Sequence, residues 1–296
     1  MIPRSLKYCL RSLALIGVLA SAQSAIAAED IPPVPAIVAQ PTKLVLPGKM
    51  VWADLLTTDV AAASRFYTAV FGWDMVPSED PGYMTAAIDG RPVAAIASYE
   101  EDTPADAEAF WLPSFSVRDV DAAMQRATGA GGTSLEQAGN LPGRGRLAVL
   151  QDPQGAVVSL LRASSGDPAD GGKPLAGAWL WPELWSSDPA AATVFYGEVL
   201  ELDAVTETDE SGLTHHILGK GNTARATAIA MPVEGVEPNW LLYIMVDDLA
   251  ATLKAAVANG GEILLPPRAG EMNSVIAIVA DPTGGVLALQ QFGGAS

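Results

Sequence analysis

The sequence predicts an α+β protein made of two tandem domains, each containing two copies of a smaller unit. Three observations support this prediction. The two halves match at a constant shift of 129 residues, which places Trp52 on Trp181 and Trp111 on Trp240. A weaker repeat of 60 residues lies inside each half. Four aspartates each separate an apolar run of strand length from an Ala-rich run, the order of a strand followed by a helix.

The first residues form a targeting segment. Arg4, Lys7 and Arg11 precede an apolar stretch, and Ala25 and Ala27 supply the small residues of a cleavage site. This pattern is typical of a secretory signal peptide, so we expect residues 1–28 to be removed and the protein to be periplasmic or secreted. An uncleaved anchor is the alternative. The processed chain would contain no cysteine, which excludes disulfides, a thiolate nucleophile and Cys metal ligands.

Residues 29–48 contain five prolines and predict an extended linker. The first domain is expected at 49–163, with helices whose N-caps are Asp59 and Asp119 and with Gly131 after the second helix. A Gly-, Ser-, Asp- and Pro-rich linker at 164–175 leads to the second domain at 176–293. There the equivalent residues are Asp188, Asp248 and Gly260. Later strands are expected at Val93–Ala97, Leu147–Leu150, Val157–Leu161, Ile276–Val279 and Val286–Gln290.

The charge balance excludes some partners. There are 34 acidic residues, and removal of the signal would leave 17 − 3 = 14 basic ones, a net charge of −20. Phosphate binding needs clustered Lys and Arg, so neither nucleic acid nor an anionic membrane is expected as a partner of the mature chain. We interpret the acidity as a means of solubility, with a cationic partner as the alternative. The oligomeric state is left open.

Several segments together resemble the vicinal oxygen chelate superfamily of glyoxalases, bleomycin-resistance proteins and extradiol dioxygenases. They are LLTTDVAAASRFYTAVFGW at 55–73, SVRDVDAAMQRATGAGG at 116–132, VLQDPQGAVVSLL at 149–161, LWSSDPAAATVFYGEVL at 184–200 and IVADPTGGVLALQ at 278–290. The resemblance covers nearly all of Met50 to Phe292. It implies paired βαβββ modules in each domain, forming a curved mixed sheet around a cup that holds a ligand, with helices outside.

The resemblance also implies where a metal would bind. The family's ligand positions fall on Trp52, Leu112 and Ser159 in the first domain and on Trp181, Leu241 and Ala288 in the second. A divalent ion needs several converging N or O donors, which these side chains do not supply. We therefore expect no metal centre of the family type and no cofactor. This disfavours glyoxalase and dioxygenase activity, because both depend on the metal.

The two-residue period of the strands predicts which side chains face each cup. Aromatic walls with a few polar groups are typical of small-molecule pockets, although the cups could be filled by their own side chains. The expected ligand-binding residues are Trp52, Asp54, Ser114 and Ser159 in the first domain, and Trp179, Trp181, Glu183, Trp185, Tyr243, Met245 and Gln290 in the second. Ser116 is expected on the first cup face as well.

Asp54 and Glu183 occupy equivalent positions and are the candidate catalytic residues. A carboxylate in an apolar cup has a raised pKa and could act as a base, or it could hold an organic cation beside a tryptophan. A bond to a neighbouring strand or arginine is the alternative. Because its first strand carries three tryptophans on the cup face, the second domain is expected to hold the more selective pocket.

Four other features of the sequence can be interpreted without assigning them a function. Of His215 and His216, which point to opposite faces of a strand, one could face the second cup near Glu183, or both could simply be packed or exposed. An arginine of the Gly143–Arg146 run could hold an anionic group at the cup mouth, or lie solvated in a turn. The Asp-Pro-x-Gly segments predict turns, and the two Phe-Tyr pairs predict core packing.

Three functions remain open from the sequence. The leading one is a metal-free protein of the bleomycin-resistance type that binds a small, aromatic or cationic organic molecule outside the cytoplasm. The second is a lyase, isomerase or dioxygenase-type enzyme, with Asp54 or Glu183 as base or with a non-standard metal site around His215, His216 and Glu183. The third is a structural or interaction protein whose cups are filled.

Overall fold

A computed structural model describes residues 34–99, 103, 107–171, 175–209 and 212–293. The expected signal peptide at 1–28 lies outside the described residues. Within the described part of the chain, no helix is long and apolar enough to cross a membrane.

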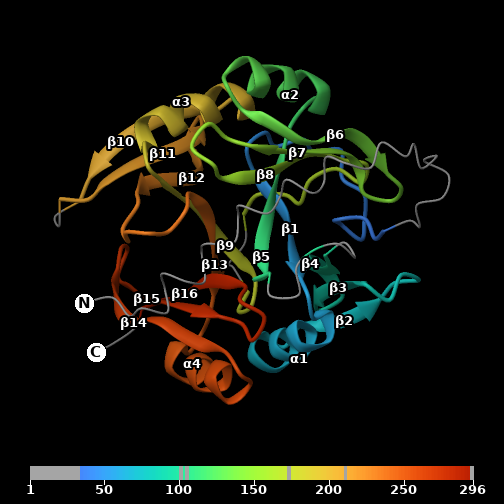
Figure 1. Cartoon of the computed structure of the whole chain (residues 1–296), viewed down its shortest axis with the longest axis vertical. Coiled ribbons are helices and arrows are strands. Elements are labelled where there is room, and N and C mark those ends of the chain that lie inside the picture. The colour runs from blue at the N-terminus through green and yellow to red at the C-terminus, as the bar shows by residue number, and fades with distance from the viewer. Residues whose placement is uncertain (1–33, 100–102, 104–106, 172–174, 210–211, 294–296) are drawn as a thin grey trace.

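Each half of the chain forms two βαβββ modules, which confirms the predicted fold class (Figure 1). The first half contains β1 (Met50–Thr57), α1 (Val60–Phe71), β2 (Asp74–Pro77), β3 (Tyr83–Ile88), β4 (Arg91–Ser98), β5 (Phe110–Ser116), α2 (Val120–Gly129), β6 (Thr133–Leu141), β7 (Gly145–Gln151) and β8 (Val157–Ala163). The second contains β9 (Trp179–Ser186), α3 (Pro189–Leu200), β10 (Asp203–Thr208), β11 (Thr214–Lys220), β12 (Thr223–Ala230), β13 (Asn239–Met245), α4 (Leu249–Ala258), β14 (Glu262–Gly270), β15 (Ser274–Ala280) and β16 (Val286–Phe292).

The four predicted N-cap aspartates begin the four helices. The carboxylate of Asp59 accepts a hydrogen bond from the Ala62 backbone N–H at 2.8 Å, and that of Asp188 accepts one from Ala191 at 3.0 Å. Asp119 and Asp248 make the same contact. Each bond satisfies an N–H group that the helix itself leaves free, so a local interaction sets the point where strand changes to helix.

Each half forms its own eight-stranded mixed sheet. The first sheet has the order β2-β3-β4-β1-β5-β8-β7-β6, and the second has the equivalent order β10-β11-β12-β9-β13-β16-β15-β14. At the centre of the first sheet, β1 pairs antiparallel with β5. On the outer sides of this pair, β4 runs parallel to β1 and β8 runs parallel to β5. The side chains of these central strands therefore project from the middle of each curved sheet.

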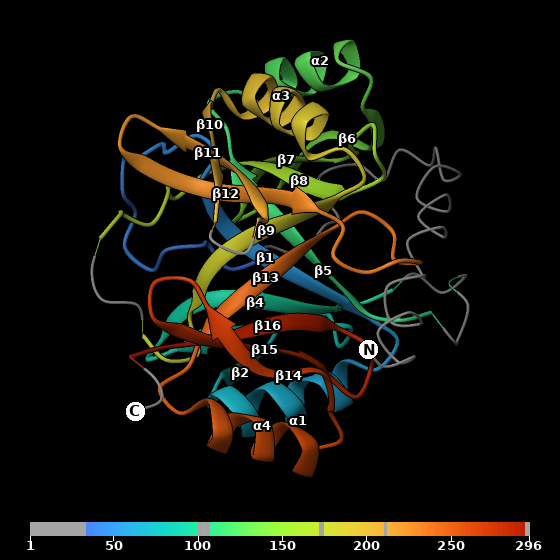
Figure 2. The same cartoon turned by 90° about the vertical axis from the view of Figure 1, so that its left-hand side faces the viewer.

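The helices of the two halves pack across the domain boundary. Figures 1 and 2 show α1 beside α4 and α2 beside α3. Arg126 of α2 donates hydrogen bonds to the carbonyl oxygens of Glu198 and Val199 in α3, each at 3.0 Å. One apolar core runs through both halves and contains Phe66, Tyr67, Phe195 and Tyr196, as predicted for the two Phe-Tyr pairs.

The Asp-Pro-x-Gly segments form the predicted turns and also join the domains. The hydroxyl of Tyr67 donates to Asp281 Oδ2 at 2.7 Å and accepts from Trp111 Nε1 at 3.1 Å. In the other copy Tyr196 donates to Asp152 Oδ2 at 3.0 Å and accepts from Trp240 at 3.1 Å. Each tyrosine thus reaches the turn of the opposite domain, a role that the sequence does not reveal.

The segment before β1 is packed on the first domain, where the sequence suggests only an extended linker. The Val34 N–H donates to the Pro142 carbonyl at 3.0 Å, and Ile37 is 3 % exposed in a cluster with Trp52 and Leu161. Asp167, in the interdomain segment, accepts hydrogen bonds from Leu46 N–H and Ser116 Oγ. Residues 34–47 therefore form part of the first domain's wall.

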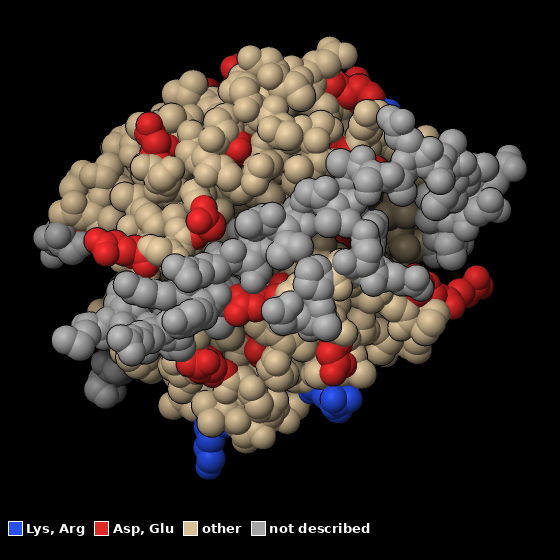
Figure 3. Space-filling model, in the orientation of Figure 1, with Lys and Arg blue, Asp and Glu red and all other residues tan. Residues whose placement is uncertain are grey.

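Acidic side chains are spread over the molecular face in Figure 3, where basic ones are few. Two of the arginines are held in surface pairs. Arg225 makes a bidentate contact with Asp170 at 2.7 Å, and Arg146 makes one with Asp121 at 2.7 Å. The Arg146–Asp121 pair is solvent-exposed and contributes little to stability. The Arg225 side chain is only 9 % exposed, and its hydrogen bonds lower the pKa of Asp170 to about 2.

Candidate functional site

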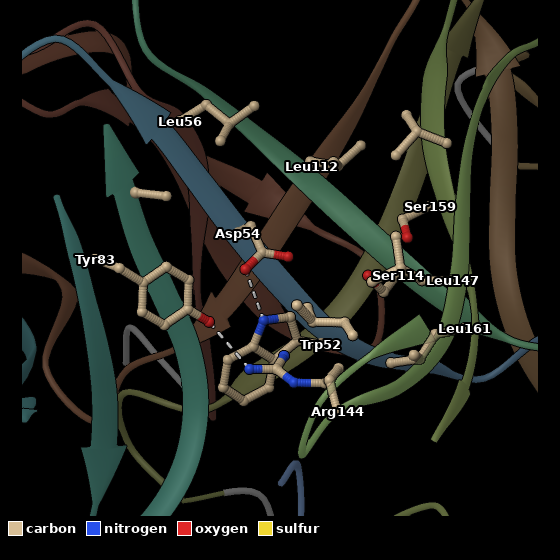
Figure 4. A pocket seen from close by; sticks show the side chains of 13 residues that line it. Trp52, Asp54, Leu56, Tyr83, Leu112, Ser114, Arg144, Leu147, Ser159 and Leu161 are labelled. Carbon is tan, nitrogen blue, oxygen red and sulfur yellow. Dashed lines mark hydrogen bonds between the residues drawn. The ribbon is translucent and has the colours of Figure 1, made fainter. Parts of the chain in front are cut away.

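A cavity of about 210 Å³ lies in the first domain (Figure 4). We call it the first-domain cavity. It is lined mainly by aliphatic side chains, with a carboxylate, a guanidinium and three hydroxyl groups among them. The lining residues come from β1, β3, β4, β5, β6, β7, β8 and the turn between β6 and β7: Trp52, Asp54, Leu56, Tyr83, Ala97, Leu112, Ser114, Leu141, Arg144, Leu147, Val149, Ser159 and Leu161.

Strand register brings the predicted polar residues together. Trp52 of β1 lies opposite Ser114 of β5, which in turn lies opposite Ser159 of β8. Asp54 lies opposite Leu112 in the neighbouring pair. Because alternate residues of a strand share a face, these side chains project into the same space. All four expected first-domain site residues line the cavity.

Asp54 is the cavity's carboxylate. Its Oδ1 accepts a hydrogen bond from Trp52 Nε1 at 2.9 Å. Burial raises the pKa of Asp54 above its usual range, and the charge of Arg144 and the bond from Trp52 offset part of that rise. A raised pKa means that the carboxyl can hold or accept a proton near neutral pH more readily than an exposed aspartate.

Arg144 closes one side of the cavity. Its guanidinium carbon lies 3.7 Å from the ring centroid of Trp52, and the side chain is only 3 % exposed. Nη2 donates to the Tyr83 hydroxyl at 3.1 Å, and Nε donates to the Pro35 carbonyl of the N-terminal segment at 3.1 Å. Of the two arginines in the Gly143–Arg146 run, Arg144 therefore lies at the cup and Arg146 lies on the surface.

The second domain holds its carboxylate differently. Glu183 Oε1 accepts hydrogen bonds from Trp185 Nε1 at 2.9 Å and from the Tyr243 hydroxyl at 3.0 Å. Burial raises the pKa of Glu183, while these two bonds and the charges of His215 and Arg268 lower it. His215 is thus the histidine that lies near Glu183, as the sequence allowed for one of the pair.

Larger side chains pack the centre of the second cup. Trp185 stands where the first domain has Leu56, and Tyr243 stands where it has Ser114. Both belong to a buried apolar cluster with Leu241 and Ala288. The remaining polar candidates bond within the domain, Trp181 Nε1 to Thr227 Oγ1 at 3.0 Å and Gln290 Nε2 to Ser274 Oγ at 2.9 Å. These polar side chains of the second cup thus have partners within their own domain.

Three expected cup residues lie elsewhere or in different surroundings. Trp179 packs against Trp111 and Trp73 with ring centroids 5.0 and 5.7 Å away, and its Nε1 donates to the Val93 carbonyl at 2.8 Å. It belongs to the interdomain core because the β9–β13 pairing shifts register between Trp181 and Trp179. Met245 is buried just beyond that shift. Ser116 bonds to Asp167, so it serves the linker and not the cavity.

The positions that hold a metal in the implied family do not form a suitable donor set in this chain. Trp52, Leu112 and Ser159 line the first-domain cavity and offer an indole, an alkyl group and one neutral hydroxyl. Trp181, Leu241 and Ala288 lie in the apolar cluster of the second domain. A divalent ion requires several basic N or O donors at one point, so these residues do not fit one.

Sequence reasoning missed Tyr83. It lies on β3, a strand for which the sequence showed no clear alternation, and it enters the cavity only because β3 pairs with β4. Burial and the charge of Asp54 raise its pKa, so the hydroxyl stays protonated and acts as a hydrogen-bonding group. The contribution of Pro35 was also missed, because a backbone carbonyl leaves no mark in a sequence.

Comparisons with known proteins agree with this architecture. The family described as Glyoxalase/Bleomycin resistance protein/Dioxygenase superfamily matches residues 49–160 and again 180–289. The chain is 31 % identical over 242 residues to CFP32 of Mycobacterium tuberculosis, which is named as a glyoxylase, covering 80 % of this chain and 92 % of that protein. It is 35 % identical over 233 residues to the anthracycline biosynthesis protein DnrV of Streptomyces peucetius, covering 73 % and 84 %.

Solved structures show the same fold at low sequence identity. The Mn(II)-bound glyoxalase from Novosphingobium aromaticivorans has a TM-score of 0.60 at 17 % identity, covering 84 % of this chain and 83 % of that one. An extradiol ring-cleaving dioxygenase from B. fuscum has a TM-score of 0.56 at 15 % identity, covering 88 % and 75 %.

Proposed function

The chain belongs to the Glyoxalase/Bleomycin resistance protein/Dioxygenase superfamily, and we propose that it is an exported member that binds a small organic molecule in the first-domain cavity without a family-type metal. The observation that supports this most is the cavity itself, an apolar space with Asp54 facing it from β1 and Arg144 from the turn between β6 and β7. Apolar walls with a few placed polar groups are the usual design of a small-molecule site.

The charges around the cavity restrict the ligand. A cationic ligand would need the face of Trp52, but the Arg144 guanidinium already stacks there at 3.7 Å and would repel it. A neutral or anionic group could instead accept hydrogen bonds near Arg144 and Tyr83, while a hydroxyl or amine faces Asp54. We therefore propose a compact aromatic ligand with carbonyl and hydroxyl groups rather than an organic cation.

The proposal that the ligand binds without a metal is supported by the side chains at the family's metal positions. Since Trp52, Leu112 and Ser159 supply a single neutral hydroxyl, ligand binding in this cavity should survive treatment with a chelator.

A second candidate is an isomerase or lyase that uses Asp54 as general base. The raised pKa of Asp54 and its place on the cavity wall favour this function, because a base works best with a pKa near the working pH. Asp54→Asn preserves the shape of the side chain and removes the base. If there is turnover, this variant should retain ligand binding and lose the reaction.

The second domain supplies the variant that tests the binding site. Tyr243 occupies in that domain the position of Ser114, so Ser114→Tyr introduces a side chain that the fold accepts there and fills the first-domain cavity. Hydroxylated aromatic ketones and quaternary ammonium compounds would be titrated into the mature chain and followed by calorimetry. We expect the ketones to bind, and Ser114→Tyr to weaken binding at least tenfold.

The matched control is Thr227→Val, which changes a polar group of the second cup and leaves the first untouched. It should bind like the unaltered chain. Binding that persists unchanged in Ser114→Tyr, or that favours the quaternary cations, would contradict the proposed site and ligand class.

A further inference from the structure

Three ionisable side chains meet at one point of the second domain. Asp209 directly follows β10, and His215 lies in β11 of the same hairpin. Glu271 lies in the turn between β14 and β15. One ligand atom from each residue lies within 4.8 Å of the others. The group draws on segments more than 50 residues apart, so the fold and not the local chain brings it together.

The geometry centres on one imidazole nitrogen. Nε2 of His215 lies 3.2 Å from Asp209 Oδ2 and 3.3 Å from Glu271 Oε1. An imidazole nitrogen carries at most one hydrogen, which can point well at only one of the two oxygens. The two contacts therefore place both carboxylates beside a single imidazole nitrogen.

The two imidazole-to-carboxylate distances fit neighbouring ligands of one metal ion. With metal–ligand bonds of about 2.0–2.2 Å and angles between octahedral and tetrahedral, neighbouring ligand atoms lie roughly 2.9–3.5 Å apart. Both Nε2 to oxygen distances lie in that range. Imidazole nitrogen and carboxylate oxygen are both donors that zinc takes, and three protein ligands leave a fourth position for water.

The ligands are oriented and accessible. The Leu213 N–H donates to the other oxygen of Asp209, Oδ1, at 3.0 Å, which is the type of outer contact that orients a ligating carboxylate. The exposed fractions of the side chains are 15 % for His215, 25 % for Asp209 and 60 % for Glu271. An ion could therefore enter from solvent while the imidazole remains held within the domain.

We propose that Asp209, His215 and Glu271 bind one divalent transition ion, zinc best among them, at a site apart from the family's metal positions. The 129-residue shift places Asp80, Ala86 and Pro142 at these positions in the first domain, so the site exists in one copy only. The bound ion would tie the β10–β11 hairpin to the β14–β15 turn. It would also add positive charge at His215, whose charge already acts to lower the pKa of Glu183.

The test uses the mature chain, residues 29–296, stripped with a chelator and titrated with Co²⁺ and then Zn²⁺. We expect one equivalent of Co²⁺ to give visible absorption bands that Zn²⁺ abolishes, and Zn²⁺ to raise the melting temperature. His215→Ala should lower the affinity at least tenfold. Glu271→Gln, on an exposed turn where loss of folding is not a concern, should lower it as well.

The neighbouring histidine is the matched control. His216 points to the other side of β11 and lies 3.4 Å from Thr206 Oγ1, so His216→Ala should bind the ion like the unaltered chain. Absence of saturable binding would overturn the proposal. Equal losses in His215→Ala and His216→Ala would overturn it too, because they would indicate adventitious surface binding.

Discussion

Equivalent residues of the two domains have acquired different neighbours. Asp54 and Glu183 stand at matching positions, and burial raises the pKa of both. Asp54 borders a cavity with Arg144 beside it, whereas Glu183 is enclosed by Trp185 and Tyr243. The first domain has Leu56 and Ser114 where the second has Trp185 and Tyr243, and only the latter two supply hydrogen-bond donors to the carboxylate.

The raised pKa of Asp54 predicts a pH-dependent stability. The folded protein binds the proton of Asp54 more tightly than the unfolded chain does, so this residue favours folding fully below its ordinary pKa of 3.8. That contribution is lost as pH rises through the raised pKa, by about 1.4 kcal/mol for each unit of upward shift. The amide that replaces the carboxyl group in Asp54→Asn cannot ionise, so the variant lacks this dependence.

Urea unfolding of both proteins across acidic to neutral pH measures this effect. The free energy of unfolding of the unaltered chain minus that of Asp54→Asn should fall as pH rises, since other titrating groups cancel in the difference. A difference that stays constant with pH would contradict the raised pKa.

The duplicated Tyr–Asp–Trp contacts predict a stability cost for removing one hydroxyl. In Tyr67→Phe the buried Asp281 carboxylate loses a donor and the Trp111 indole loses its acceptor. Unsatisfied buried groups cost about 1–3 kcal/mol, so the free energy of unfolding should fall by that amount. Tyr196→Phe should cost a similar amount, because it makes the same bonds to Asp152 and Trp240. A loss below about 0.5 kcal/mol in both would show that water replaces the hydroxyl.

At the scale of elements, the repeated helices end differently. α1 ends at Gly72 in the left-handed region, with φ of 69°, where glycine adopts the conformation without steric cost. At the equivalent end of α3 the same conformation, with φ of 57°, falls on Glu201. A residue with a Cβ is strained there, and the exposed pair of Glu201 with Arg118 at 3.4 Å offsets little of that strain.

Glu201→Gly should therefore raise the free energy of unfolding, by about 0.5–1 kcal/mol. Gly72→Ala tests the reverse change, because it introduces a Cβ where α1 ends in the same conformation. Its new Cβ would meet nothing within 4 Å, so only backbone strain acts, and the variant should lose about 1 kcal/mol. Thermal or urea unfolding of both variants measures these changes. A stabilised Gly72→Ala would show that the left-handed conformation is not strained at these ends.

At the scale of the whole molecule, the two domains share one core and exchange polar contacts through both Asp-Pro-x-Gly turns. The segment at 34–47 belongs to the same folded unit, because Ile37 is buried and the Pro35 carbonyl accepts from Arg144. If cleavage follows Ala27 or Ala28, the mature chain keeps this segment entire.

Export is the prediction that belongs to this scale. The intact mass of protein taken from the periplasm or medium should lack the first 27 or 28 residues. The same protein should not react with a thiol reagent, because Cys9 is the single cysteine of the chain and leaves with the signal. A mature mass that still includes Met1 to Ala25 would show that the segment is not cleaved there.

The sequence alone determined what depends on local interactions and on period. Each N-cap aspartate needs only the next turn of backbone, and each Asp-Pro-x-Gly turn needs only its own residues. The repeat of 129 residues presents the pattern of the fold class in both halves. The alternation along β1 and β5 was enough to place Trp52, Asp54 and Ser114 on one face.

Only the tertiary structure decided which side chains line the first-domain cavity and which expected cup residues lie elsewhere. Trp179 leaves the second cup because of a register shift, Tyr83 enters the first through strand pairing, and Pro35 holds Arg144 from 109 residues away. The meeting of Asp209, His215 and Glu271 is of the same kind. Such outcomes depend on side-chain volume and on contacts between distant segments, which neither spacing nor period along the chain encodes.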